Sequence, residues 1–234
     1  MNRKFSFSVG EFYHIYSRGT DKRNIFLDDN DRKRFQVLLY VSNNSKCVHL
    51  SNFQQNQGRT LMDLFDAVGI SDRSLVDIGA YCLMPNHFHL MIREKSENGI
   101  SRFMKKLLTG YSMYFNAKYE RTGSLFESKF KARHVDTDEY LKYLFAYVHL
   151  NPVKLLEPTW KETGITKKYL AIDFLKKYQF SSYLDYLGVN RVVYKIINKD
   201  SFPGYFEKPK DFKEYVNWWL SLNRDENKII KVGP

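Results

Sequence analysis

Two histidines separated by one residue, His87 and His89, have the spacing of a metal-binding pair. They open a segment, residues 87–93, whose composition is typical of a β-strand. Because successive side chains of a strand point to opposite faces, both imidazoles would project to one side and Phe88 to the other. This geometry suits one shared metal ion. The pair by itself is weakly specific, and two unrelated histidines remain the alternative.

A second candidate set, Tyr147 and Asn151, lies four residues apart in a segment with helical character. This spacing places both side chains on one helix face, one turn apart. A hydroxyl nucleophile and an amide oxygen ligand could therefore reach the same site. Tyr140 and Tyr143 share that face, so ordinary packing of three tyrosines is the competing interpretation.

The elements that must position these residues follow from composition and periodicity. Strands are predicted over 12–17, 78–84, 87–93 and 129–134, and helices over 28–41, 100–119 and 139–151. Pro85-Asn86 predicts a hairpin turn, and Asp136-Thr137-Asp138 predicts a helix N-cap. The first six elements have the order of a ferredoxin-like unit. We therefore expect an α+β fold, an antiparallel sheet with helices on one face and one extra helix.

Two regions fit this unit less well. Residues 42–76 are largely polar and aperiodic, apart from a short helix over 61–68, and are interpreted as an insertion or long loop. Beyond residue 156 the chain changes to short segments rich in Lys and Tyr. The sequence thus predicts a domain over 1–156, with the insertion at about 42–76, and a helical C-terminal extension over 157–234.

The charge balance favours a polyanionic partner without proving one. Lys and Arg number 37 against 26 Asp and Glu, a formal net charge of +11. Eight basic residues near the predicted site are candidates for phosphate contacts, although a solvated charged face explains any one of them as well. They are Arg18, Lys22, Arg102, Lys105, Lys106, Lys129, Lys131 and Arg133.

Four motifs occur in a fixed order along the chain: Met84-Pro85-Asn86-His87-Phe88-His89-Leu90, the block 123–131, the run 147–154 and Phe180-Ser181-Ser182-Tyr183. As an ordered set over roughly residues 10–188, they closely resemble the REP-associated tyrosine transposases. These are a branch of the HUH endonucleases, named for His-hydrophobic-His. The ordered set is far more specific than any single motif.

The resemblance implies roles for individual residues. His87 and His89 would bind a divalent metal, Tyr147 would be the nucleophile, and Asn151 would complete the metal shell, where other branches have Gln. Tyr147 would join the 5′ end of a cut single strand and release a free 3′ hydroxyl for strand transfer. The metal would be Mg²⁺ or Mn²⁺, and because imidazole suits softer ions, manganese should bind better.

The expected partner is single-stranded DNA carrying a REP-like hairpin, bound by a monomer or homodimer. The chain shows neither a signal peptide nor an apolar run long enough to span a bilayer, so a cytoplasmic protein without membrane contacts is expected. Two alternatives remain open. A plain metal-dependent phosphodiesterase would use the histidines to activate water, and a hairpin-binding protein would use no catalysis.

Overall fold

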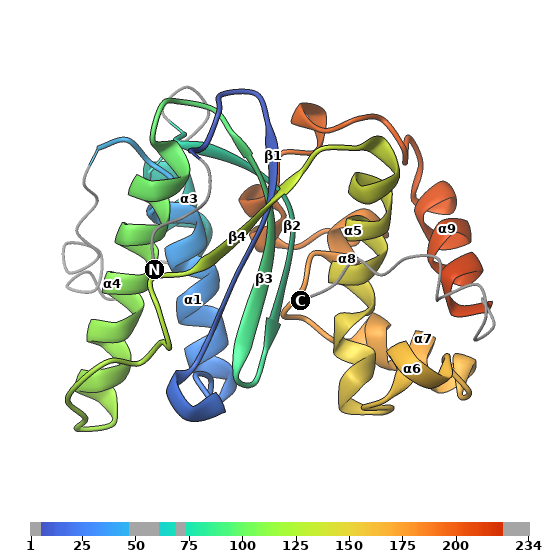
Figure 1. Ribbon diagram of the computed structural model, residues 1–234, viewed down its shortest axis with the longest axis horizontal. Coiled ribbons are helices and arrows are strands. Elements are labelled where there is room, and N and C mark those ends of the chain that lie inside the picture. The colour runs from blue at the N-terminus through green and yellow to red at the C-terminus, as the bar shows by residue number, and fades with distance from the viewer. Residues whose placement is uncertain (1–5, 47–60, 69–73, 222–234) are drawn as a thin grey trace.

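A four-stranded antiparallel sheet forms the centre of the described chain, which comprises residues 6–46, 61–68 and 74–221 of a computed structural model (Figure 1). The strands are β1 (Phe12–Arg18), β2 (Val76–Met84), β3 (His87–Glu94) and β4 (Lys131–Val135). Their order in the sheet is β2-β3-β1-β4, and β3 pairs antiparallel with both β1 and β2. This is the ferredoxin-like order, so the predicted fold class is confirmed.

Helices cover both faces of this sheet (Figure 1). Helices α1 (Asp29–Val41) and α4 (Gly99–Lys118) lie on one face, and α5 (Asp138–Leu150), the predicted extra helix, lies on the other. Capping explains where two of them begin: Asp28 accepts from the Asp31 amide at the start of α1, and Thr137 accepts from the Tyr140 amide in α5.

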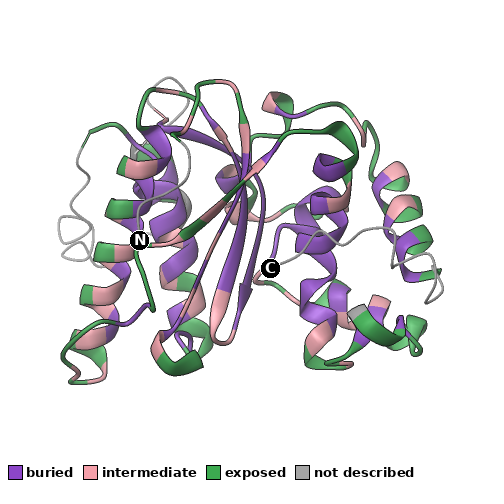
Figure 2. Cartoon of the chain, in the orientation of Figure 1, coloured by how far each residue is buried: buried purple, intermediate pink, exposed green. Residues whose placement is uncertain are grey.

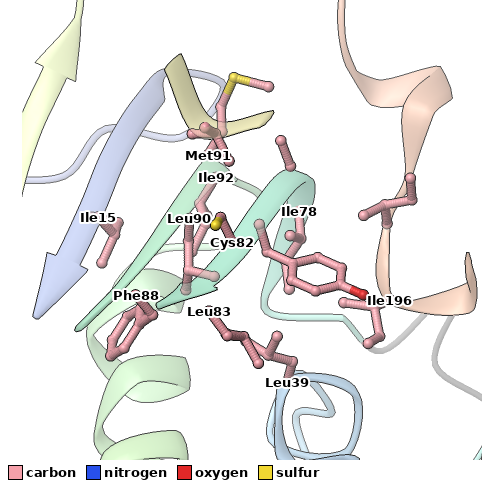
Figure 3. Packing of buried hydrophobic residues seen from close by; sticks show 14 of the residues in the cluster. Ile15, Leu39, Ile78, Cys82, Leu83, Phe88, Leu90, Met91, Ile92 and Ile196 are labelled. Atoms are coloured by element: carbon pink, nitrogen blue, oxygen red, sulfur yellow. The ribbon is translucent and has the colours of Figure 1, made fainter. Parts of the chain in front are cut away.

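Strand alternation divides the sheet into an apolar face and a face that carries the histidines. Ile15, Phe88 and Leu90 are fully buried in the core beneath α1 and α4 (Figure 3). Phe35 of α1, for example, meets Phe88 with ring centroids 5.0 Å apart. The neighbouring residues along β1 and β3 therefore point toward α5, and most residues of β1, β3 and α5 are buried (Figure 2).

The predicted insertion lies partly outside the described residues, which omit 47–60 and 69–73. The short helix predicted within it is present as α3 (Leu61–Val68). Its Phe65 is fully buried and stacks on Tyr40 of α1 with ring centroids 4.0 Å apart. Helix α3 is thus docked on the core through an aromatic pair.

After residue 156 the described chain is built from short helices, as expected. These are α6 (Trp160–Thr163), α7 (Lys168–Lys177), α8 (Tyr183–Tyr186) and α9 (Pro209–Ser221), with 3₁₀ turns at Val192–Ile196 and Lys199–Ser201. Main-chain hydrogen bonds join this part to the outer edge of β2: Ser182 N donates to Tyr81 O over 3.0 Å, and Leu83 N donates to Phe180 O over 2.9 Å. The edge of β2 is therefore covered along these residues. In the described part of the chain, no helix is long and apolar enough to cross a membrane.

Candidate active site

The register of β1 against β3 gathers several ring side chains on the α5 face of the sheet. Tyr16 pairs with His89 and Arg18 pairs with His87, so His14 and Tyr16 share a face with the two predicted histidines. The His87 and His89 ring centroids are 5.0 Å apart, as are those of His14 and His89. The predicted same-side geometry of the His-x-His pair is present, with a third histidine beside it.

Both predicted metal-binding histidines are held through their Nδ1 atoms. Nδ1 of His87 lies 2.6 Å from Oδ1 of Asn86, and Nδ1 of His89 lies 2.9 Å from Nε2 of His14. A metal ion shared by the two rings would therefore bind Nε2 of each. His87 is half-buried whereas His89 is only 3% exposed, so the pair runs from the surface into the interior.

Helix α5 brings Tyr147 to this histidine pair. The Tyr147 hydroxyl lies 3.4 Å from Nε2 of His89, and the two rings meet edge to face with centroids 5.1 Å apart. Burial raises the pKa of Tyr147 well above its ordinary value, an effect that the nearby Asn151 amide opposes. The hydroxyl is therefore held as a neutral phenol beside the imidazole.

Asn151 follows the last residue of α5 and begins a 3₁₀ turn over Asn151–Leu155, in which Pro152 is the second residue. Its side chain is fully buried. The amide is close enough to Tyr147 to favour the phenolate, yet neither its Oδ1 nor its Nδ2 has a hydrogen bond of good geometry within the described residues. Buried polar atoms are rarely left in this state, because each unsatisfied group is destabilising. The amide oxygen therefore fits the role of a ligand for an ion between α5 and the sheet.

The other two tyrosines on the same helix face meet different partners. Tyr143 packs edge to face against Trp219 of α9, with ring centroids 5.5 Å apart. The guanidinium of Arg133 lies over the Tyr140 ring, 4.9 Å from its centroid. Together with Tyr147 they form a stacked row along α5. Packing explains Tyr140 and Tyr143, while Tyr147 is the member whose hydroxyl meets a histidine.

Three of the eight predicted DNA contacts border the histidine face. Lys131 and Arg133 of β4 pair in register with Tyr16 and His14, and Lys131 Nζ lies 6.0 Å from the Tyr16 ring centroid. Arg18, opposite His87, is ion-paired with Glu127 at 2.8 Å. The predicted alternation of residues 131–134 is present: Lys131 and Arg133 are exposed, and the residue that follows each of them is partly buried.

The remaining predicted contacts lie on other segments, although the Lys22 carbonyl accepts a hydrogen bond from Nδ2 of Asn86, the residue beside His87. Lys22, in the turn after β1, and Lys129, just before β4, are exposed. Arg102, Lys105 and Lys106 belong to α4, which covers the opposite face of the sheet (Figure 1). Lys106 also donates to the Asn44 and Lys46 carbonyls, over 2.7 and 3.0 Å. The fold does not bring these three α4 residues to the histidine face.

Sequence reasoning missed His14, Tyr16 and Asn86 as members of the site. Asn86 stands next to His87, so adjacency was a usable signal. For His14 and Tyr16, the only local signal was the alternation of β1, which puts them on one face without saying which strand lies beside them. Their membership depends on pairing between β1 and β3, which lie about 75 residues apart, as the His14–His89 contact shows.

Comparison with known proteins gives a family match over part of this chain. Residues 53–151 match the family described as IS200-like transposase. No curated protein matches this chain. Among solved structures, the chain is similar to "Structure of the REP associates tyrosine transposase bound to a REP hairpin", with a TM-score of 0.46 and 11% sequence identity over 82% of this chain and 89% of that chain. The matched segment contains His87, His89, Tyr147 and Asn151, and the predicted resemblance of this chain to transposases is therefore confirmed over residues 53–151.

Proposed function

We propose that this protein is a metal-dependent endonuclease and strand transferase for single-stranded DNA, with Tyr147 as its nucleophile. One observation carries the proposal: the Tyr147 hydroxyl lies 3.4 Å from Nε2 of His89, in a chain whose family segment is that of a transposase. A hydroxyl beside a potential metal ligand has the arrangement that phosphoryl transfer to a tyrosine requires.

Nε2 of His87, Nε2 of His89 and Oδ1 of Asn151 would hold a divalent ion. Support comes from the two Nδ1 contacts, which orient both rings, and from the buried Asn151 amide that lacks a good hydrogen bond among the described residues. When bound, such an ion would polarise the scissile phosphate and offset its developing charge. Two imidazoles favour Mn²⁺ over Mg²⁺ in affinity, and either ion could serve.

The reaction conserves the number of phosphate ester bonds. The Tyr147 oxygen attacks phosphorus in line, forming an O–P bond as the bond between phosphorus and the 3′ oxygen breaks. The phenol loses its proton, and the departing 3′ oxygen gains one. The products are a 5′-phosphotyrosine and a 3′ hydroxyl, which can attack the phosphotyrosine in the reverse sense and join a new strand without ATP.

A single copy of the chain supplies every residue that the proposal needs. Tyr147, His87 and His89 meet within one chain, and α5 is anchored by nine buried residues between Tyr140 and Leu150. We therefore propose that Tyr147 acts on the metal site of its own subunit. Mixing two inactive variants, Tyr147→Phe and His87→Ala, should then restore no cleavage, whereas action in trans would restore it.

The proposed substrate is a single strand flanking a hairpin. Tyr147 is only 2% exposed whereas His87 is half-buried, so the proposal places entry of the phosphate on the more accessible His87 side. A stacked duplex resists the bending that such entry needs. The exposed Lys131 and Arg133 lie on the same sheet face and could follow the hairpin backbone.

The decisive experiment incubates the protein with single-stranded DNA from the flanks of its own gene, with Mn²⁺ or EDTA, followed by denaturing electrophoresis. A covalent complex should form only with metal, and Tyr147→Phe should abolish it while DNA binding persists. Tyr143→Phe is the matched control, because it removes a hydroxyl one turn away, and it should retain the complex.

The alternatives predict other patterns in the same gel. Metal-dependent cleavage without a covalent complex would indicate a phosphodiesterase that activates water. Hairpin binding with neither product would indicate a non-catalytic binding protein.

A further inference from the structure

The histidine on β1, His14, has no role in the reaction proposed above, although it is almost completely buried beside His89. Its side chain is 1% exposed, and its ring lies nearly parallel to that of His89, with 30° between the planes. Nε2 of His14 is 2.9 Å from Nδ1 of His89. Burial of a second polar ring in direct contact with a candidate ligand requires an explanation.

The two nitrogens of His89 have different neighbours, and this difference defines what His14 can do. Nε2 of His89 faces the Tyr147 hydroxyl, while Nδ1, on the opposite side of the ring, faces His14. If Nε2 binds a metal it carries no proton, so the proton of a neutral His89 must be on Nδ1. His14 would then accept that N–H through its own Nε2.

We propose that His14 is a positioning residue for His89: it selects the tautomer with a proton on Nδ1 and orients Nε2 toward the metal position. The inference rests on the proposed metal-binding role of His89. His87 supports it, since its Nδ1 meets Oδ1 of Asn86 at 2.6 Å in the equivalent arrangement. Each of the two candidate histidine ligands thus has a partner that can accept its Nδ1 hydrogen. Such partners typically change metal affinity by 10- to 100-fold.

A matched pair of variants tests this role through metal binding rather than cleavage. His14→Phe keeps an aromatic ring beside His89 and removes the acceptor, whereas His14→Gln keeps an acceptor near the position of Nε2. We expect Mn²⁺ affinity, measured by electron paramagnetic resonance titration, to fall about 10- to 100-fold in His14→Phe and to stay close to the parent in His14→Gln. His134→Phe is the control, because His134 bonds Glu11 on the other face of the sheet.

The outcomes separate this inference from the proposed function. If the parent protein and His87→Ala bind Mn²⁺ equally poorly, the metal site itself is wrong. If the parent binds and His87→Ala does not, while His14→Phe binds like the parent, only the role of His14 is refuted. Equal weakening in His14→Phe and His14→Gln would also refute it, because the acceptor would then be irrelevant.

A measurement on the unmodified protein covers the case in which a variant fails to fold. In the metal-free chain, where no ion fixes the tautomer, long-range ¹⁵N–¹H correlation spectra of the neutral histidine rings should show His89 protonated at Nδ1 and not at Nε2. A proton on Nε2 of His89 would overturn the proposal.

Discussion

Replacing Asn151 by Leu should stabilise the metal-free protein while removing a proposed metal ligand. The Asn151 amide is fully buried, and neither of its polar atoms has a good hydrogen bond among the described residues. An unsatisfied buried polar group costs about 1–3 kcal/mol. Leu has a similar size and carries no polar atom, so the variant loses this cost and keeps most of the packing.

The magnitude follows from the partial compensation of that cost. The nearby Tyr147 hydroxyl offsets part of the cost of the buried amide. We therefore expect the free energy of unfolding of Asn151→Leu to exceed that of the parent by about 1–2 kcal/mol, near the lower end of the range. A protein of this size changes its Tm by roughly 2–4 °C per kcal/mol, which gives a rise of about 2–8 °C without metal.

Thermal unfolding with EDTA and with Mn²⁺ measures both effects. The parent should gain stability from Mn²⁺, and Asn151→Leu should gain much less and form no covalent DNA complex. Asn151→Asp is the informative partner variant. It keeps a ligand oxygen but buries a charge, so it should be less stable than the parent with EDTA and recover when Mn²⁺ is added.

The opposite pattern would refute the reasoning. If Asn151→Leu is destabilised with EDTA and still responds fully to Mn²⁺, Asn151 is a structural residue that binds no ion.

Three further predictions concern stability, pH and DNA binding. Arg191→Met leaves the buried Asp185 carboxylate unpaired and should cost about 3–5 kcal/mol in chemical denaturation. Burial already raises the pKa of Asp185 in the parent protein, and an acid whose pKa is raised on folding loses stability as pH rises. The stability lost through Arg191→Met should therefore be larger at pH 8 than at pH 5. Equal losses at the two pH values would contradict this. Burial raises the pKa of Asp31, but hydrogen bonds from its lysine and tyrosine partners and from two main-chain amides lower this pKa overall. The ionised carboxylate therefore contributes to the free energy of unfolding above about pH 4, and this contribution is lost in acid. Asp31→Asn should therefore lower the stability at pH 7 and reduce the fall in stability between neutral and acid pH. An unchanged dependence of stability on pH would contradict this role of Asp31. In gel shifts with a hairpin-bearing single strand, Lys131→Gln should reduce the slope of log affinity against log salt concentration by roughly 0.7–0.9, whereas Lys105→Gln on α4 should leave this slope unchanged. Equal effects of the two substitutions would show that the DNA does not bind preferentially on the histidine face of the sheet.

Local pattern was sufficient to predict the elements and the shared face of the two candidate histidine ligands. Alternation along residues 87–93 predicted that His87 and His89 share a face, because strand geometry is a property of the segment itself. The helix that carries Tyr147 could likewise be predicted from its N-cap at Thr137 and its end before Pro152. The order of these elements indicated the ferredoxin-like sheet, since few arrangements satisfy that order with short connections.

Only the tertiary structure decided which side chains meet. His14 reaches His89 because β1 and β3 pair in one particular register, and a shift of one residue would turn His14 to the other face. The fold also places α5 on the histidine face of the sheet, whereas α4, which carries Arg102, covers the opposite face (Figure 1). Pairing of strands distant in sequence depends on how both apolar faces are buried together. No local periodicity encodes that pairing, so the sequence predicted the candidate ligands and only the fold showed which side chains surround them.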